Sequence, residues 1–210
     1  MANSSLYILR HGETLFNVQN KTQGWCDSPL TERGVEQARI AGRTLAARGI
    51  EFDLLYSSTS ERCCDTLEFT LAAGWGTVPA YERKKGLKEM NFGAFEAKDQ
   101  FLERFPHGDF YAKYGGETQD QALERFSNEV QGIMRATKDG QNVLVVSHGG
   151  VGVMLFHALV PNPEPGSVPF GNCICYHYTY EGGELVWQET IVPDFSSLDK
   201  EGMPPQVRYR

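Results

Sequence analysis

The strongest constraint on the fold is that short apolar runs alternate along the chain with segments whose apolar residues recur at helical spacing. Leu6–Leu9, Phe52–Tyr56 and Val143–Val146 are apolar runs of strand length, and a helix-period segment follows each of them. Strands that alternate with helices in this way form parallel βαβ units. We therefore expect an α/β fold with a mostly parallel central sheet and helices on both of its faces.

Hydroxyl side chains mark where three of these helices begin. Thr31 precedes a segment with one apolar face, as an N-cap residue does. Ser58 with Glu61, and Thr118 with Gln121, have the spacing of a capping box, in which each side chain satisfies a backbone N–H group of the other. These patterns predict helix starts just after Thr31, Ser58 and Thr118.

The remaining segments complete the expected organisation. Cys173–Tyr180 and Glu184–Thr190 flank Gly182-Gly183 and predict a β-hairpin at an edge of the sheet. The chain from Pro193 onward is rich in proline and charge, which predicts a loosely packed tail. A length of 210 residues is typical of one domain, so we expect a single domain over residues 1–210.

The segment from about Glu89 to Thr118 departs from the alternating pattern because aromatic residues gather in it. We expect it to be an insertion that forms a short cap over the functional site. A helix pair buried against the core explains the same composition, and the sequence leaves this alternative open. The aromatic residues are Phe92, Phe95, Phe101, Phe105, Phe110, Tyr111 and Tyr114.

Composition excludes several classes of protein. With 20 basic and 27 acidic residues the net charge is −7, which excludes a general attraction to nucleic acid or to anionic membranes. Five cysteines without a CxxC pair predict reduced thiols rather than a disulfide framework. The amino terminus lacks the basic segment of a secretory signal, and no apolar run is long enough to span a bilayer. We expect a cytoplasmic protein with neither nucleic acid nor membrane as a partner.

Two histidines follow predicted strands and stand next to glycines. His11 lies in Arg10-His11-Gly12, and His148 lies in Ser147-His148-Gly149-Gly150. The carboxyl ends of parallel strands meet at one edge of a sheet, where α/β folds bind their ligands. Arg62 falls in the first turn of the helix after the second strand, so its guanidinium reaches the same edge. Two arginines, two histidines and helix N-termini at one edge suit a tetrahedral dianion.

Each of these residues has a structural explanation when it is taken alone, because capping histidines and solvated arginines are common. Rival chemistries lack their motifs. The chain has no complete GxGxxG fingerprint, no GxSxG elbow, no GxxxxGK[ST] loop and no histidine spacing typical of a metal site. The joint placement of the four side chains at strand ends favours an anion site.

A set of motifs in a fixed order resembles the histidine phosphatase superfamily in its phosphoglycerate-mutase-like branch. Two departures stand out. Phe95-Glu96-Ala97 occupies the place where the family often has Trp-Glu-Gly, and Cys63-Cys64 that of Arg-Ala. The matching motifs are Leu9-Arg10-His11-Gly12-Glu13-Thr14, Asn17, Gln23-Gly24-Trp25, Leu30-Thr31-Glu32-Arg33-Gly34, Tyr56-Ser57-Ser58 with Arg62 and Thr66, Glu89 with Phe92-Gly93, Gly115-Gly116-Glu117-Thr118, and Val145-Val146-Ser147-His148-Gly149-Gly150.

The resemblance implies a mechanism and assigns roles. His11 would be a nucleophile that forms a phosphohistidine, although the sequence leaves open which ring nitrogen attacks. Glu89 would be the general acid and then the base that activates water. Neither metal nor cofactor is implied. Arg10, Arg62 and His148 would supply positive charge to the phosphate, and Asn17, Gln23 and the backbone at Gly24 and Gly149 would lie beside it.

The expected function is hydrolysis of a small phosphorylated metabolite through phosphohistidine, by a monomer or homodimer. A mutase needs a longer cover over its phosphohistidine, whereas Gly115 follows Glu89 by only 26 positions (115 − 89). Family mutases also carry an arginine pair in this segment, where this chain has Arg104 alone, with Lys98 and Lys113 as weaker candidates. Phosphoglycerate mutation is therefore the first alternative. A phosphate-binding protein without catalysis is the second.

Overall fold

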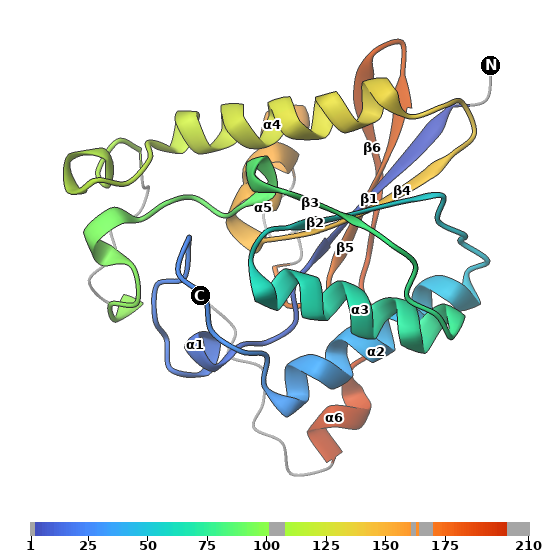
Figure 1. The fold of residues 1–210 in the computed structure, drawn as a ribbon, viewed down its shortest axis with the longest axis horizontal. Coiled ribbons are helices and arrows are strands. Elements are labelled where there is room, and N and C mark those ends of the chain that lie inside the picture. Colours follow the sequence, from blue (N-terminus) through green and yellow to red (C-terminus); the bar gives the residue numbers. More distant parts are fainter. Residues whose placement is uncertain (1–2, 101–107, 161–162, 164–169, 201–210) are drawn as a thin grey trace.

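The computed structural model describes residues 3–100, 108–160, 163 and 170–200. Its described residues form one six-stranded sheet with the strand order β3-β2-β4-β1-β5-β6 (Figure 1). Strands β1 to β4 pair in parallel, and β5 and β6 add an antiparallel hairpin at one edge. The expected mostly parallel sheet and edge hairpin are confirmed. The strands are β1 (Ser4–Arg10), β2 (Leu54–Ser58), β3 (Glu82–Lys84), β4 (Asn142–Ser147), β5 (Cys175–Glu181) and β6 (Glu184–Ile191).

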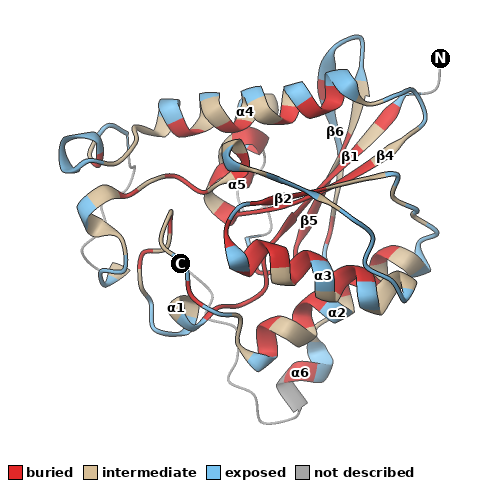
Figure 2. Ribbon diagram, viewed as in Figure 1, coloured by how far each residue is buried: buried red, intermediate tan, exposed pale blue. Residues whose placement is uncertain are grey.

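Helices cover both faces of this sheet, as the alternating pattern predicts. Helices α2 (Glu32–Ala47) and α3 (Glu61–Trp75) lie on one face, and α4 (Gln119–Ala136) and α5 (Gly149–Leu159) lie on the other (Figure 1). Figure 2 shows the buried residues of these helices on the sides that face the sheet. Successive side chains of a strand point to opposite faces, so each strand feeds both layers of core.

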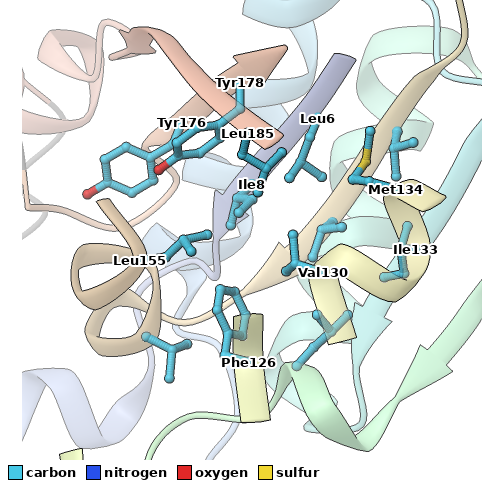
Figure 3. Packing of buried hydrophobic residues seen from close by; sticks show 14 of the residues in the cluster. Leu6, Ile8, Phe126, Val130, Ile133, Met134, Leu155, Tyr176, Tyr178 and Leu185 are labelled. Carbon is cyan, nitrogen blue, oxygen red and sulfur yellow. The ribbon is translucent and has the colours of Figure 1, made fainter. Parts of the chain in front are cut away.

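The two cores divide the residues of β1 and β4 between them. Leu6 and Ile8 point toward α4 and α5, where Phe126 and Val130 meet them (Figure 3). The alternate residues of β1, Tyr7 and Leu9, pack with α2 and α3, and Leu144 and Val146 of β4 do the same. This division explains why the central strands read as continuous apolar runs rather than as alternating ones.

Two of the three predicted helix starts are confirmed. Thr31 caps α2 and accepts a hydrogen bond from the N–H of Gly34. Thr118 and Gln121 form the capping box of α4, with both reciprocal bonds present. The prediction for Ser58 is wrong, because this residue ends strand β2 and the N-cap of α3 is Ser60.

The expected cap segment holds two short 3₁₀ turns in its described part, η2 (Gly93–Phe95) and η4 (Ala112–Tyr114). Edge-to-face contacts join its aromatic rings, including that of Phe95 with Phe110 at 5.4 Å between centroids. Tyr111 is fully buried with Met90. Phe101, Phe105 and Arg104 lie outside the described residues.

The beginning of the expected loose tail is packed. A short helix, α6 (Ser196–Lys200), buries Leu198 to 2% exposure, and Phe195 contacts the core beneath α2 and α3. Residues 201–210 lie outside the described part of the chain. Among the described residues, no helix is both long and apolar enough to cross a membrane.

Candidate active site

The two histidines meet at the carboxyl edge of the sheet because β1 and β4 are parallel neighbours in register. Arg10 pairs with Ser147 at the ends of these strands, and one histidine follows each. The N–H of His11 donates to the carbonyl of Ser147 at 3.0 Å, which ties the two strand ends together. The imidazole centroids of His11 and His148 are 5.4 Å apart, with the rings inclined by 70°.

His11 is held as a neutral imidazole with a defined tautomer. Its Nδ1 lies 2.8 Å from the carbonyl oxygen of Gly12. A carbonyl only accepts, so Nδ1 carries the proton and Nε2 keeps its lone pair. Burial, followed by the charges of Arg62 and Arg10, holds the pKa of His11 well below its usual value. The nitrogen with nucleophilic character is therefore Nε2.

The loop after His11 is pinned between α2 and α3. The N–H of Gly12 donates to Thr66 Oγ1 at 3.0 Å, and that hydroxyl donates to the carbonyl of Arg62 at 2.6 Å. A Cβ on Gly12 would lie 2.4 Å from the carbonyl oxygen of Gly34, so only glycine fits this close approach. The acceptor that sets the tautomer of His11 is thus fixed by two helices.

Arg62 is fully buried in the first turn of α3, and it contacts three of the other predicted residues. Its Nη2 donates to the carbonyl of Gly24 at 2.9 Å and to Nδ1 of His148 at 2.8 Å. Its Nη1 donates to the carbonyl of Cys26 and to Asp27 Oδ1. The amide oxygen of Gln23 accepts from Nε at 2.9 Å. The predicted cation therefore organises the loop from Gln23 to Asp27.

His148 is held in the tautomer that carries its proton on Nε2. Guanidinium only donates, so the contact with Arg62 leaves Nδ1 of His148 bare, and Nε2 carries the proton and donates to Ser58 Oγ at 2.9 Å. Burial, followed by the charge of Arg62, holds the pKa of His148 well below its usual value. Burial beside a permanent cation favours the neutral form of His148, and its role as a source of positive charge for the phosphate stays a prediction.

Glu89 is anchored at the N-terminus of α5, directly after His148. Its Oε2 accepts the N–H of Gly150 at 2.8 Å, and its Oε1 accepts those of Val151 and Met90, each at 3.0 Å. The backbone of Glu89 is held as well, because Trp25 Nε1 and Arg125 Nη2 both donate to its carbonyl at 3.0 Å. A carboxylate at a helix N-terminus is favoured by the helix dipole.

Arg10 and Gly149 are in contact. A Cβ on Gly149 would lie 2.8 Å from Arg10 Nε, so this glycine makes room for the guanidinium. The ring of Phe170, itself 47% exposed, lies over Arg10 with its centroid 4.3 Å from Cζ. Sequence reasoning missed Phe170, which no motif marks.

Asn17 is bonded directly to the residues around His11, whereas the N–H of Gly24 points away from them. Asn17 Oδ1 accepts from Asn172 Nδ2, which also donates to the carbonyl of His11, so Asn17 belongs to the site. The N–H of Gly24 instead donates to Glu96 Oε2 at 3.1 Å. Gly24 is therefore linked to the site through its carbonyl and Arg62.

Several positioning residues escaped the sequence interpretation because their role is to hold backbone. Glu96 accepts the N–H groups of Gly24, Trp25, Cys26 and Phe92 and so fixes the loop beneath Arg62. The sequence did mark Glu96, because it is the central residue of Phe95-Glu96-Ala97, which resembles the Trp-Glu-Gly motif of the family. Arg125 pairs with Glu117 through two bonds of 2.7 and 2.8 Å, and no short motif announces it.

Two buried histidines and two buried arginines meet at the carboxyl edge of this sheet, which places the protein among α/β proteins with a site suited to a tetrahedral dianion such as phosphate. Among the described residues, no group of three or more His, Cys, Asp or Glu could hold a metal ion. The family model for the histidine phosphatase superfamily (branch 1) matches residues 6–191, and the chain belongs to this family. The resemblance drawn from the motifs is thereby confirmed.

Relatives include both mutases and phosphatases. A 2,3-bisphosphoglycerate-dependent phosphoglycerate mutase of Beijerinckia indica is 30% identical over 175 residues, which make up 76% of this chain and 84% of that protein. A phosphoglycerate mutase structure from Bacillus anthracis has a TM-score of 0.78 and 28% identity, covering 95% of this chain and 96% of that one. A mycobacterial glucosyl-3-phosphoglycerate phosphatase has a TM-score of 0.69 and 25% identity, covering 89% and 96%.

Proposed function

We propose that this protein hydrolyses phosphate monoesters through a phosphohistidine at Nε2 of His11. The observation that carries the proposal is the hydrogen bond from Nδ1 of His11 to the carbonyl of Gly12, because it leaves a lone pair on a neutral, buried imidazole. Such a nitrogen attacks phosphorus without a separate base, whereas a hydroxyl nucleophile needs one.

In the first step a bond forms between Nε2 of His11 and phosphorus, while the ester P–O bond breaks. The electron pair leaves with the alcohol oxygen, and Glu89, which enters this step protonated on Oε2, gives that oxygen its proton. Oε2 of Glu89 accepts one backbone hydrogen bond and so retains a lone pair that can carry this proton. Arg10 and Arg62 balance the charge on the equatorial oxygens, which is the main demand of phosphoryl transfer.

In the second step water attacks phosphorus, and its proton passes to the carboxylate of Glu89. The bond between phosphorus and Nε2 breaks, inorganic phosphate leaves and His11 returns to its neutral form. Nδ1 keeps its proton throughout, since Gly12 is held by Thr66 and the tautomer does not change. The proposed mechanism needs no metal ion, because the guanidinium charges of Arg10 and Arg62 take the place of a metal ion in balancing the phosphate oxygens.

Water is favoured over a second hydroxyl by the shortness of the cap. The segment between Glu89 and Gly115 contains two 3₁₀ turns and an aromatic cluster in its described part. Of the two described candidates for a carboxylate partner, Lys98 is exposed, and Lys113 lies over the rings of Phe110 and Tyr114 at 5.2 and 5.5 Å. Such a cap is suited neither to holding a phosphoglycerate intermediate nor to excluding water from the phosphohistidine.

Phosphoglycerate mutation is the second candidate, because a curated mutase is 30% identical over most of the chain. It uses the same nucleophile and differs only in the acceptor of the phosphoryl group. A phosphate-binding protein without catalysis is less consistent with the site, since binding needs neither a nucleophile nor an anchored carboxylate.

Trapping the covalent intermediate tests the proposal. Rapid quenching in base during turnover of a ³²P-labelled ester, with chelator present throughout, should give labelled protein. A phosphoramidate is acid-labile and base-stable, so later acid treatment should remove the label. His11→Ala should carry no label and lose essentially all turnover. Near-normal turnover in His11→Ala would overturn the mechanism, and a requirement for added metal would overturn its metal independence.

A further inference from the structure

Arg62 has no N–H group left over within the chain. Its Nε donates to the Gln23 oxygen, which also lies 3.1 Å from Nη1. The two Nη1 hydrogens serve the Cys26 carbonyl and Asp27, and the two Nη2 hydrogens serve the Gly24 carbonyl and His148. Guanidinium has five N–H donors, and this network uses all five. A phosphate oxygen therefore receives an N–H from Arg62 only where an internal acceptor gives it up.

Asp27 differs from the other acceptors because it is charged. Its Oδ1 lies 2.8 Å from Arg62 Nη1, and its side chain is 30% exposed whereas that of Arg62 is fully buried. The other four acceptors are neutral oxygens or an imidazole nitrogen. Whichever N–H a phosphate takes, it meets a guanidinium whose charge Asp27 already balances in part.

Asp27 also keeps other hydrogen-bond donors when a phosphate displaces it from Arg62. Its Oδ1 accepts the N–H of Ser28 at 3.1 Å, and its Oδ2 accepts the N–H of Glu61 at the start of α3. Its exposed side is open to water, which replaces a lost donor at little cost. The carboxylate can therefore weaken its contact with Arg62 without becoming a buried, unpaired charge.

We propose that Asp27 limits how tightly the site holds phosphate, by competing with the bound dianion for the charge and the hydrogen bonds of Arg62. The inference rests on the proposed phosphate-ester chemistry and names a residue that tunes it. A hydrolase must release inorganic phosphate after each turnover, and a buried arginine without a competing carboxylate retains a dianion. Asp27 is thus a positioning residue for Arg62 that favours product release.

The sign of the change in phosphate affinity tests this proposal. Asp27→Asn keeps an oxygen acceptor for Glu61 and removes the charge, and titration calorimetry with inorganic phosphate measures the Kd. We expect the variant to bind phosphate about three- to tenfold more tightly than the wild type, with a parallel fall in the product-inhibition constant. A merely structural role predicts the opposite sign, because a loosened loop binds phosphate more weakly.

Two controls isolate the charge of Asp27. Asp27→Glu retains the carboxylate, and Glu61→Gln removes an exposed charge from the same helix end, so both should bind phosphate within about twofold of the wild type. If circular dichroism shows Asp27→Asn to be unfolded, Asp27→Ser carries the same prediction. Unchanged or weaker phosphate binding in a folded neutral variant would overturn the inference. Failure of the wild type to bind phosphate would instead overturn the proposed function.

Discussion

At the scale of single residues, one hydrogen bond decides which nitrogen of His11 is nucleophilic. The carbonyl of Gly12 accepts from Nδ1, and the hydrogen bond of Gly12 to Thr66 holds that carbonyl in place. His148 has the opposite tautomer, since its Nδ1 faces Arg62 and its Nε2 faces Ser58. Two imidazoles whose centroids are 5.4 Å apart thus have opposite tautomers, and under the proposed function the one with the bare Nε2 is the nucleophile.

The role of Glu89 can be tested through the leaving group. Glu89→Gln cannot give up a proton, so single-turnover phosphorylation of the enzyme by an alkyl phosphate should slow by about 10²- to 10⁴-fold. A nitrophenyl ester has a leaving oxygen that hardly needs protonation, so its loss should be about tenfold or less. Single-turnover measurements are needed because hydrolysis of the phosphoenzyme is common to both esters. Equal losses for the two esters would make Glu89 a structural residue.

The residues that sequence reasoning found are those that short motifs mark. His11, Arg62 and His148 follow strand ends or begin a helix, and such places can be read from local pattern. Ser58 and Asp27 could not be assigned in this way, because their partners stand 90 and 35 positions away in the chain. Ser58 also has the spacing of a helix cap, which competed with its actual place at the end of β2.

At the scale of elements, long amphipathic helices and buried strands were predictable, whereas short polar elements were not. The capping box of α4 could be predicted because both partners lie within four residues of each other. Strand β3 has the sequence Glu-Arg-Lys and is stabilised by pairing with β2, not by its own apolar pattern. Because β3 depends on pairing with a strand far away in the chain, its three polar residues carry no local pattern from which it could be predicted.

Ala97 is strained by its position in the cap segment. This exposed residue has a φ of 62°, a left-handed conformation that costs a non-glycine residue about 1–2 kcal/mol. The motif that Phe95-Glu96-Ala97 resembles often has glycine here, and the positive φ accounts for that preference. Ala97→Gly should raise the free energy of unfolding by about 0.5–1 kcal/mol, after the entropic cost of glycine is subtracted.

Urea denaturation checks this prediction, and a neighbouring alanine is its control. Ala94 is also exposed and is not among the residues with positive φ. Ala94→Gly should therefore lower the free energy of unfolding by about 0.5–1 kcal/mol. Changes of the same sign in both variants would contradict the strain assigned to Ala97.

At the scale of the whole molecule, the buried histidines make stability depend on pH. The pKa of His11 and that of His148 are held well below the usual value, chiefly by burial. Below about pH 6.5 the unfolded chain binds protons that the folded chain does not, so stability is present above that pH and falls as the pH is lowered. Each histidine should contribute a slope of about 1.4 kcal/mol per pH unit until its folded pKa is reached.

Urea denaturation of the wild type and of His148→Gln between pH 7.5 and 5.5 measures this linkage. The variant should lose stability less steeply below about pH 6.5, because one of the two buried histidines no longer contributes. The substitution itself lowers the free energy of unfolding by the same amount at every pH, so it does not affect the slopes that are compared. Identical slopes would show that folding does not lower the pKa of His148.

The central claim is our proposal that the phosphoryl group on His11 passes to water rather than to a second hydroxyl of a phosphoglycerate. Incubation with 3-phosphoglycerate and catalytic 2,3-bisphosphoglycerate, with inorganic phosphate and 2-phosphoglycerate measured in the same samples, tests it most directly. We predict that free phosphate exceeds 2-phosphoglycerate by a wide margin, and that both are absent with His11→Ala. Efficient formation of 2-phosphoglycerate with little free phosphate would contradict the claim and identify the protein as a mutase.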